Sequence, residues 1–292
     1  MTLPSVDTTV TFPSGALTST GVVQHRSTLA DGRLVVVLDV TAFHPVDAAW
    51  PDQGTDRGTL TVGSREFSIV DAVVGATDGI ELFLGADIPV RKGTEGWAFV
   101  VAHLIEASLD DVAEGAAVTV SVDGSYRAAL SLGHTACHLA SLALNAALSA
   151  AWTKDVAPDA YGNANFDALA IETSTILENG SLDVYRLGKS LRKKGFTPAA
   201  LTDDVEAVAA AITGRLQQWA AEDAPAVVRA EGPLLTDRRY WETELDGISI
   251  SIPCGGTHAA SLGAVSGIRS TLSAEDTGSA IEVRMSTVVP AA

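Results

Sequence analysis

The sequence predicts an α+β protein: an N-terminal small β-barrel domain followed by an α+β domain whose helices pack on an antiparallel sheet. The first 122 residues are short β-branched runs separated by Gly, Asp and Pro. Beyond them, Ala- and Leu-rich stretches with helical spacing alternate with strand-like stretches. A chain of 292 residues with 47% hydrophobic residues can bury one large core or two ordinary ones. We place the domain boundary near Asp123-Gly-Ser125, which gives domains 1–124 and 125–292.

The N-terminal domain is expected to consist of strands alone, because no segment of comparable strength with helical spacing interrupts its strand-like runs. Short strands at this spacing are typical of a small barrel or a sandwich, and we adopt the barrel as the prediction. The expected strands are 9–12, 21–24, 33–40, 59–62, 66–70, 80–84, 97–101 and 117–122.

The C-terminal domain is expected to begin with a buried helix from about Gly133 to Ala151. A loop around Pro158 and Gly162 should precede a strand over 167–176, and Glu178-Asn-Gly180 should turn the chain. Further elements are a short basic helix capped by Ser181 and ending at Gly195, a helix from Asp203 to about Ala221, and antiparallel strands at 239–245, 248–252, 267–272 and 280–289.

Two short clusters of metal-binding residue types lie far apart in the chain, His134-Thr-Ala-Cys-His138 and Cys254-Gly-Gly-Thr-His258. The i, i+4 spacing places both imidazoles of the first cluster on one face of a helix. Gly255 and Gly256 favour a tight turn that brings Cys254 and His258 to one point. Thiolate sulfur and imidazole nitrogen are ligands that zinc prefers. The sequence therefore predicts one Zn²⁺ held by four side chains: His134, His138, Cys254 and His258.

The cysteine count, the hydropathy and the absence of nucleotide-binding motifs exclude several classes of protein. With Cys137 and Cys254 as the two cysteines, a disulfide framework is excluded, and Cys137 is expected in the core. No apolar run has the length that spans a bilayer, no leader is evident after Met1, and we expect a cytoplasmic protein with no membrane partner. There is no GxxxxGK[ST] and no strand-linked GxGxxG, so nucleotide chemistry has no support.

The net charge of −17 argues against broad binding to nucleic acid, and we expect no double-stranded DNA partner. One local segment is nevertheless basic, and its side chains are candidates for binding phosphate or the end of a tRNA, or form a solvated helix face. These residues are Arg186, Lys189, Arg192, Lys193 and Lys194.

The paired clusters resemble the editing domain of alanyl-tRNA synthetases and the free-standing alanyl-tRNA trans-editing proteins, a family related to the second additional domain of threonyl-tRNA synthetases. The family's HTAxH and distant CGGTH are matched letter for letter at 134–138 and 254–258. Residues 41–58 are similar to the family's FxP followed by GGQxxDxG, through Phe43, Pro45, Gln53, Asp56 and Gly58. The order of β-rich domain, histidine helix and α+β domain is also similar to the family.

The resemblance implies hydrolysis, in trans, of the ester that joins a wrong amino acid, serine or glycine, to alanine tRNA. It implies zinc at the reaction centre, with a zinc-bound water as the reactive group and the aminoacyl-tRNA acceptor end as the partner. Gln53 would contact substrate, and Thr257, between two ligands, could donate to the substrate or hydrogen-bond the turn. Asp167, Glu172 and Asp183 could act as a base or bind an amine, and none is assigned.

Three features depart from the family. Pro51 and Asp52 replace two glycines before Gln53, the segment 161–196 does not align, and no aminoacylation module is present. Two alternatives remain beside the editing function. One is a zinc-dependent hydrolase of a small amino-acid ester or amide, and the other is a non-catalytic binding protein stabilised by a structural zinc.

Overall fold

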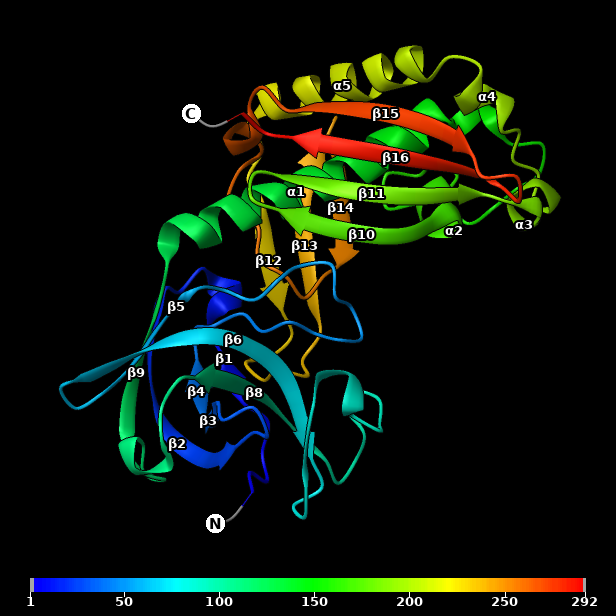
Figure 1. Ribbon diagram of the computed structural model, residues 1–292. Helices are drawn as coiled ribbons and strands as arrows, with labels where there is room; N and C mark the ends of the chain where they lie inside the picture. Colours follow the sequence, from blue (N-terminus) through cyan, green and yellow to red (C-terminus); the bar gives the residue numbers. More distant parts are fainter. Residues whose placement is uncertain (1–2, 291–292) are drawn as a thin grey trace. The chain divides into compact units, whose positions relative to one another are not determined.

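The computed structural model describes residues 3–290, so the outermost residues of the expected domains 1–124 and 125–292 lie outside the description. The chain divides into two compact units (Figure 1). Unit 1 comprises residues 3–127, Arg229–Arg239 and Gly255–Thr257. Unit 2 comprises Ala128–Val228, Tyr240–Cys254 and 258–290. Each unit therefore contains segments that are remote in the sequence.

Unit 1 is built on a closed barrel of six antiparallel strands in the order β5-β9-β2-β3-β8-β6, and β5 pairs with β6 to close it. Strand β7 extends the sheet beyond β6, and β1 pairs with β4 in parallel. The strands are β1 (Thr9–Val10), β2 (Thr18–Thr28), β3 (Leu34–Leu38), β4 (Val40–Thr41), β5 (Gly58–Val62), β6 (Arg65–Thr77), β7 (Leu82–Leu84), β8 (Ala98–Ile105) and β9 (Ala117–Val122).

The continuous apolar run of β3 is explained by burial on both faces. Leu34, Val36 and Leu38 belong to the main cluster of the barrel, while Val35 and Val37 pack in a second cluster with residues of β8. Alternation is therefore absent where a strand has no solvated face. The barrel predicted from the spacing of the runs is confirmed.

Unit 2 contains most of the residues of two sheets and most of the helical residues, while the start of α1, the end of β12 and the first residue of β13 belong to unit 1. The pairings of β10, β11, β16 and β15, and of β13 with β14, are antiparallel. One sheet has the order β10-β11-β16-β15 and the other β12-β13-β14. The strands are β10 (Ile171–Leu177), β11 (Gly180–Leu187), β12 (Val227–Ala230), β13 (Arg239–Leu245), β14 (Ile248–Pro253), β15 (Arg269–Asp276) and β16 (Ile281–Val288). The helices are α1 (Gly124–Ala147), α2 (Phe166–Ala170), α3 (Lys189–Lys193), α4 (Ala199–Thr202) and α5 (Val205–Glu222). Short 3₁₀ helices occur at Phe12–Ser14, Gly85–Asp87, Leu109–Asp111, Ser149–Ala151 and Leu262–Val265.

Helices α1 and α5 contribute to a single apolar core with the sheets of unit 2. Figure 1 shows α5 lying along β15, where Thr213 Oγ1 donates to Ser270 O and accepts from Ser270 N. Helix α1 packs on the β10–β11 hairpin at Gly133. A Cβ at Gly133 would lie 2.2 Å from Leu177 O and 2.5 Å from Gly180 O, so only glycine allows this approach.

Three elements differ most from the sequence prediction. Helix α1 begins at Gly124 rather than near Gly133, because Asp123 Oδ1 accepts from the backbone N–H groups of Ser125 and Tyr126. The expected strand at 167–176 begins as the short helix α2 and becomes β10 at Ile171. The expected helix capped by Ser181 is wrong over 181–187, since this segment is an inner strand paired with β10 and β16.

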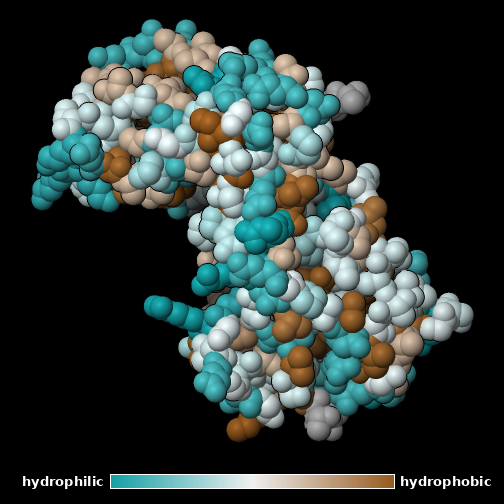
Figure 2. Space-filling view, turned by 180° about the vertical axis from the view of Figure 1, so that it is seen from behind, coloured by the Kyte–Doolittle hydropathy of each residue, from teal (hydrophilic) through white to brown (hydrophobic). Residues whose placement is uncertain are grey.

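The surface mixes residue types. On the face shown in Figure 2, hydrophilic and hydrophobic residues are interspersed. Large exposed hydrophobic residues such as Val6, Trp50 and Ile80 are far apart in the sequence. Within residues 3–290, no helix combines the length and apolar character needed to cross a membrane.

The close approach at Gly133 predicts a large effect of one methyl group. Gly133→Ala should lower the free energy of unfolding of unit 2 by about 1–3 kcal/mol, because the added Cβ meets backbone atoms that cannot rotate away. Gly214→Ala is the matched control in α5, where an added Cβ meets no atom within 4 Å, and it should stabilise by roughly 0.5–1 kcal/mol. Urea unfolding of both variants measures the difference, and equal stability of the two would contradict the packing described.

The barrel core also contains a histidine that must stay neutral. His103 is fully buried, where its Nε2 lies 2.9 Å from Thr41 Oγ1 and its Nδ1 3.1 Å from Val36 O. Burial lowers the pKa of His103 to about 4 and that of the buried His44 to about 3. A histidine whose pKa is lower in the folded state stabilises fully above the unfolded pKa and loses that contribution as the pH falls.

We therefore expect the stability of unit 1 to fall between pH 6.5 and 4, by about 3 kcal/mol from His103 alone. His103→Gln cannot titrate and should reduce the slope of unfolding free energy against pH in this range by up to about 1.4 kcal/mol per pH unit. Urea unfolding between pH 4 and 7 measures this slope. An unchanged slope in the variant would show that His103 does not carry the effect.

Candidate metal centre

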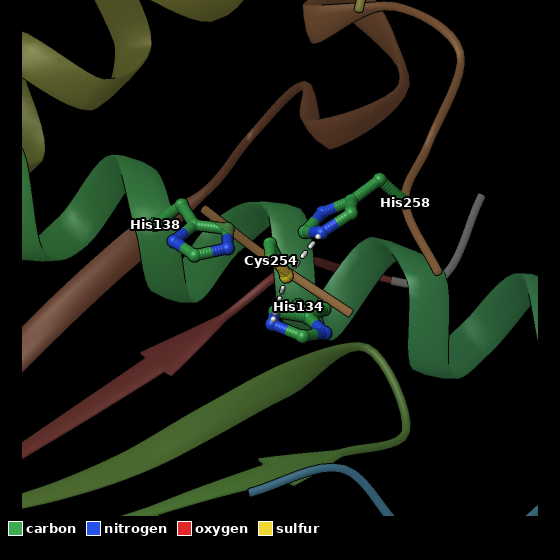
Figure 3. A group of neighbouring side chains, drawn as sticks. All are labelled: His134, His138, Cys254 and His258. Carbon is green, nitrogen blue, oxygen red and sulfur yellow. Dashed lines mark hydrogen bonds between the residues drawn. The ribbon is translucent and has the colours of Figure 1, made fainter. Parts of the chain in front are cut away.

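The four side chains of the two clusters come together in unit 2. His134, His138, Cys254 and His258 each offer one ligand atom, and these atoms all lie within 4.8 Å of one another. Figure 3 shows the two histidines of α1 facing Cys254 and His258 from the segment after β14. One metal ion could be held by this group.

The thiol of Cys254 lies close to two of the imidazoles. Cys254 Sγ lies 3.4 Å from His134 Nε2 and 3.2 Å from His258 Nε2. The rings of His134 and His138 stack with centroids 4.9 Å apart, as the i, i+4 spacing on α1 predicts. Of the four residues, His134 is buried and the other three are half-buried. One of the four candidate ligands is therefore enclosed by the protein, and the other three are partly accessible to solvent.

Local structure explains how each ligand is placed. Gly133 fixes α1 on the β10–β11 turn one residue before His134. Strand β14 is held in register with β13 through Pro253, opposite Tyr240, and Cys254 follows directly. Gly255 does not adopt a positive φ, and an added Cβ there would meet no atom within 4 Å. The convergence of Cys254 with His258 therefore does not depend on left-handed backbone at Gly255.

Two residues that sequence analysis missed contact the candidate ligands. Thr135 Oγ1 lies 3.3 Å from His258 Nδ1 and accepts a hydrogen bond from Ala259 N at 3.0 Å. A metal ion on His258 Nε2 would leave Nδ1 to carry the proton and donate to Thr135 Oγ1, which would fix the ring. The fully buried Trp241 packs against the rings of His138 and His258 at centroid distances of 5.3 and 5.7 Å. The sequence placed Trp241 in an expected strand at 239–245, and nothing in the sequence linked it to the histidines.

Gln53 and Thr257 are engaged with each other in unit 1. Gln53 Nε2 donates to Thr257 Oγ1 at 3.0 Å, and Thr257 N donates to Gln53 Oε1 at 3.1 Å. Both residues are buried. Asp56 is also buried and forms an ion pair with Arg127. Both ends of the Gln53 amide therefore bind Thr257, and these two hydrogen bonds hold the Gly255–Thr257 segment that precedes His258.

The acidic candidates lie outside the ligand group. Asp183 is buried and accepts from Ser174 Oγ at 2.6 Å, Ser181 Oγ at 3.0 Å and Cys137 Sγ at 3.5 Å. Asp167 accepts from the Tyr185 hydroxyl at 2.9 Å, and burial raises the pKa of Asp167 to about 6. Burial also raises the pKa of the Cys137 thiol, so Cys137 is a poor source of thiolate.

The basic residues form a surface feature of unit 2. Lys189, Arg192, Lys193 and Lys194 are exposed on and after α3, whose Leu191 is buried. Arg186 differs from them, since it lies on β11 and its guanidinium contacts Glu172 Oε1 and Ser279 Oγ. Glu172 is therefore part of a surface ion pair.

Comparison with known proteins does not assign the chain to a family. No protein-family model matches the sequence, and no curated protein is detectably similar to it.

The geometry predicts that metal binding depends on one of the two cysteines. After loading with zinc and gel filtration, the wild-type protein should retain about one ion per chain, and Cys254→Ser should retain much less because a hydroxyl is a poor substitute for thiolate. Cys137→Ser is the matched control, since this thiol points at Asp183 instead. Elemental analysis by mass spectrometry measures the content. Equal loss in both variants, or loss in neither, would contradict the ligand assignment.

Proposed function

We propose that the protein is a zinc-dependent hydrolase that deacylates mischarged aminoacyl-tRNA, removing serine or glycine from alanine tRNA. The observation that carries the proposal is the convergence of four donors from two clusters whose ligands His134 and Cys254 are 120 residues apart. The letter-for-letter resemblance of both clusters to the editing family supplies the substrate class.

The donor set fits zinc. Zinc–nitrogen bonds of about 2.0–2.1 Å and a zinc–sulfur bond of about 2.3 Å in a tetrahedron separate neighbouring donors by about 3.3–3.6 Å. The distances from Cys254 Sγ to His134 Nε2 and His258 Nε2 are 3.4 and 3.2 Å. Three imidazoles and a thiolate suit zinc far better than magnesium or calcium, which take oxygen ligands.

Bound zinc supplies a Lewis acid that lowers the pKa of water and polarises an ester carbonyl. The reaction is hydrolysis, in which water adds to the carbonyl carbon and the terminal ribose hydroxyl leaves. The protein holds the histidine rings still, through Thr135 at His258 and Trp241 at His138. His138, Cys254 and His258 are half-buried, so the group is not wholly enclosed by the protein. Asp167 and Asp183 are occupied by internal hydrogen bonds, so neither is assigned as the base.

The donor count favours a second candidate. Four protein ligands can close a tetrahedral shell, as they do in structural zinc sites, whereas catalytic sites keep one position for water or substrate. The alternative is therefore a binding protein stabilised by its metal. In that case zinc removal lowers the melting temperature and no ester is cleaved under any condition.

Deacylation of charged tRNA tests the proposal directly. The zinc-loaded protein should release serine and glycine from alanine tRNA well above the spontaneous rate, and alanine more slowly. Cys254→Ser should lose at least about a hundredfold in rate, because its loss removes a ligand of the reactive centre. Cys137→Ser should retain activity. Loss of radiolabelled amino acid from precipitated tRNA measures each rate.

Two outcomes would contradict this assignment. A wild-type rate equal to that of buffer, with zinc bound, would leave the metal-stabilised binding protein. Cleavage of serine or glycine esters of small alcohols, with no preference for the tRNA ester and no loss in high salt, would favour the hydrolase of small amino-acid esters.

A further inference from the structure

A group of cations on unit 2 is larger than the sequence segment that suggested it. We call Lys154, Lys189, Arg192, Lys193 and Lys194 the basic cluster. Lys154 joins the other four because Lys154 Nζ donates to Lys193 O at 2.9 Å and Thr153 N donates to Gly195 O at 2.9 Å. All five side chains are exposed.

The basic cluster stands on an ordered surface. Leu191, which lies between Lys189 and Arg192 on α3, is buried, and the Phe196 ring lies 5.1 Å from that of Trp152. Gly195 has a φ of +100°, and an added Cβ there would lie 2.9 Å from Lys154 N. The two backbone segments from which the cations project are therefore fixed side by side.

The cations of the basic cluster have no carboxylate partner among residues 3–290. In the part of the chain that the structure describes, no carboxylate forms an ion pair with any of the five. Asp155 is the acidic neighbour in sequence, and Arg186 nearby is paired with Glu172. The chain has 36 acidic and 19 basic residues, so five unpaired cations on one surface are unexpected for a merely solvated face. A polyanion would be repelled over most of such a protein and attracted here.

The position of the basic cluster relative to the metal centre indicates which part of a tRNA it meets. Cys137, next to His138, contacts Asp183 on β11. From Asp183, strand β11 runs to Leu187, and Gly188, also extended, leads to Lys189 at the start of α3. Six residues of extended backbone span about 20 Å, which sets the scale of the separation between α3 and the turn of α1 that carries the candidate ligands. Figure 1 shows α3 at the end of β11 opposite the β10–β11 turn. Both features belong to unit 2.

We infer that the basic cluster binds the phosphate backbone of the acceptor-stem duplex of the substrate tRNA. This inference rests on the proposed function, which puts the aminoacyl ester at the metal centre. A stacked strand that rises about 3.4 Å per nucleotide covers 20 Å in about six nucleotides, which exceeds the unpaired 3′ end of a tRNA and reaches its first base pairs. Duplex RNA is bound largely through its shape and phosphates, so the basic cluster contributes affinity without reading the bases.

Binding of uncharged tRNA tests the inference independently of hydrolysis. Lys189→Glu combined with Arg192→Glu should weaken binding of tRNA, and of an RNA hairpin that copies the acceptor stem and 3′ end, by at least about tenfold at 0.1 M salt. The slope of log affinity against log salt should fall by about one for each phosphate that the variant no longer neutralises. Arg91→Glu combined with Arg269→Glu makes the same change in net charge at exposed positions outside the basic cluster and should leave affinity within about twofold.

Further readouts separate this inference from the proposed function. If the proposed function holds, the cluster variant should raise KM for seryl-tRNA and leave kcat unchanged, with zinc content unchanged. If no deacylation occurs but tRNA binding falls in the cluster variant alone, the proposed function fails and the surface assignment stands. Equal tRNA affinity in the cluster variant and the wild type would overturn the assignment. So would a loss confined to a single-stranded 3′-end oligonucleotide, or a loss confined to phosphatidylserine vesicles.

Discussion

The structure of unit 2 depends on bringing two pairs of donors to one point when His134 and Cys254 are 120 residues apart. Each pair is preset locally, the first by one turn of α1 and the second by the short segment after β14. Long-range packing then joins them: Gly133 seats α1 on a β-turn, Trp241 packs against two of the imidazoles, and Thr135 links α1 to His258 and Ala259. An ion that binds all four donors would cross-link these segments and stabilise the folded state relative to the unfolded chain.

The two segments that carry the candidate ligands are held in place in different ways. Helix α1 is long and rigid, so a shift at Gly133 moves both of its histidines together. The Cys254–His258 segment is short and includes Gly255–Thr257, which belong to unit 1 and are held there by Gln53. Gln53 was expected to contact substrate. In the structure both ends of its amide are hydrogen-bonded to Thr257, so its role here is structural. The resemblance to the editing family at 41–58 therefore includes residues that shape the protein, Gln53 and Asp56, as well as any that meet a ligand.

The sequence was sufficient wherever residue type and spacing carry the information. The four candidate metal ligands follow from His and Cys at i, i+4 spacing, and the barrel strands follow from β-branched runs between turns. It was insufficient where tertiary contacts decide. Residues 181–187 have no strong strand pattern and become a strand because β10 and β16 flank them. Glycine is unfavourable in helices, so Gly124 and Gly133 argued against a helix over the first turns of α1. Asp123 was not recognised as the residue that caps this helix. Thr135 and Trp241 became ligand-orienting residues only once the fold placed them beside His258 and His138.

The measurement that tests the central claim most directly is X-ray absorption at the zinc edge of the loaded protein. Coordination by His134, His138, Cys254 and His258 predicts one sulfur at about 2.3 Å together with imidazole nitrogens at about 2.0–2.1 Å. The sulfur signal should vanish in Cys254→Ser and persist in Cys137→Ser. A spectrum with no sulfur ligand in the wild type, or one whose sulfur survives the loss of Cys254, would contradict a metal centre built from these two remote segments.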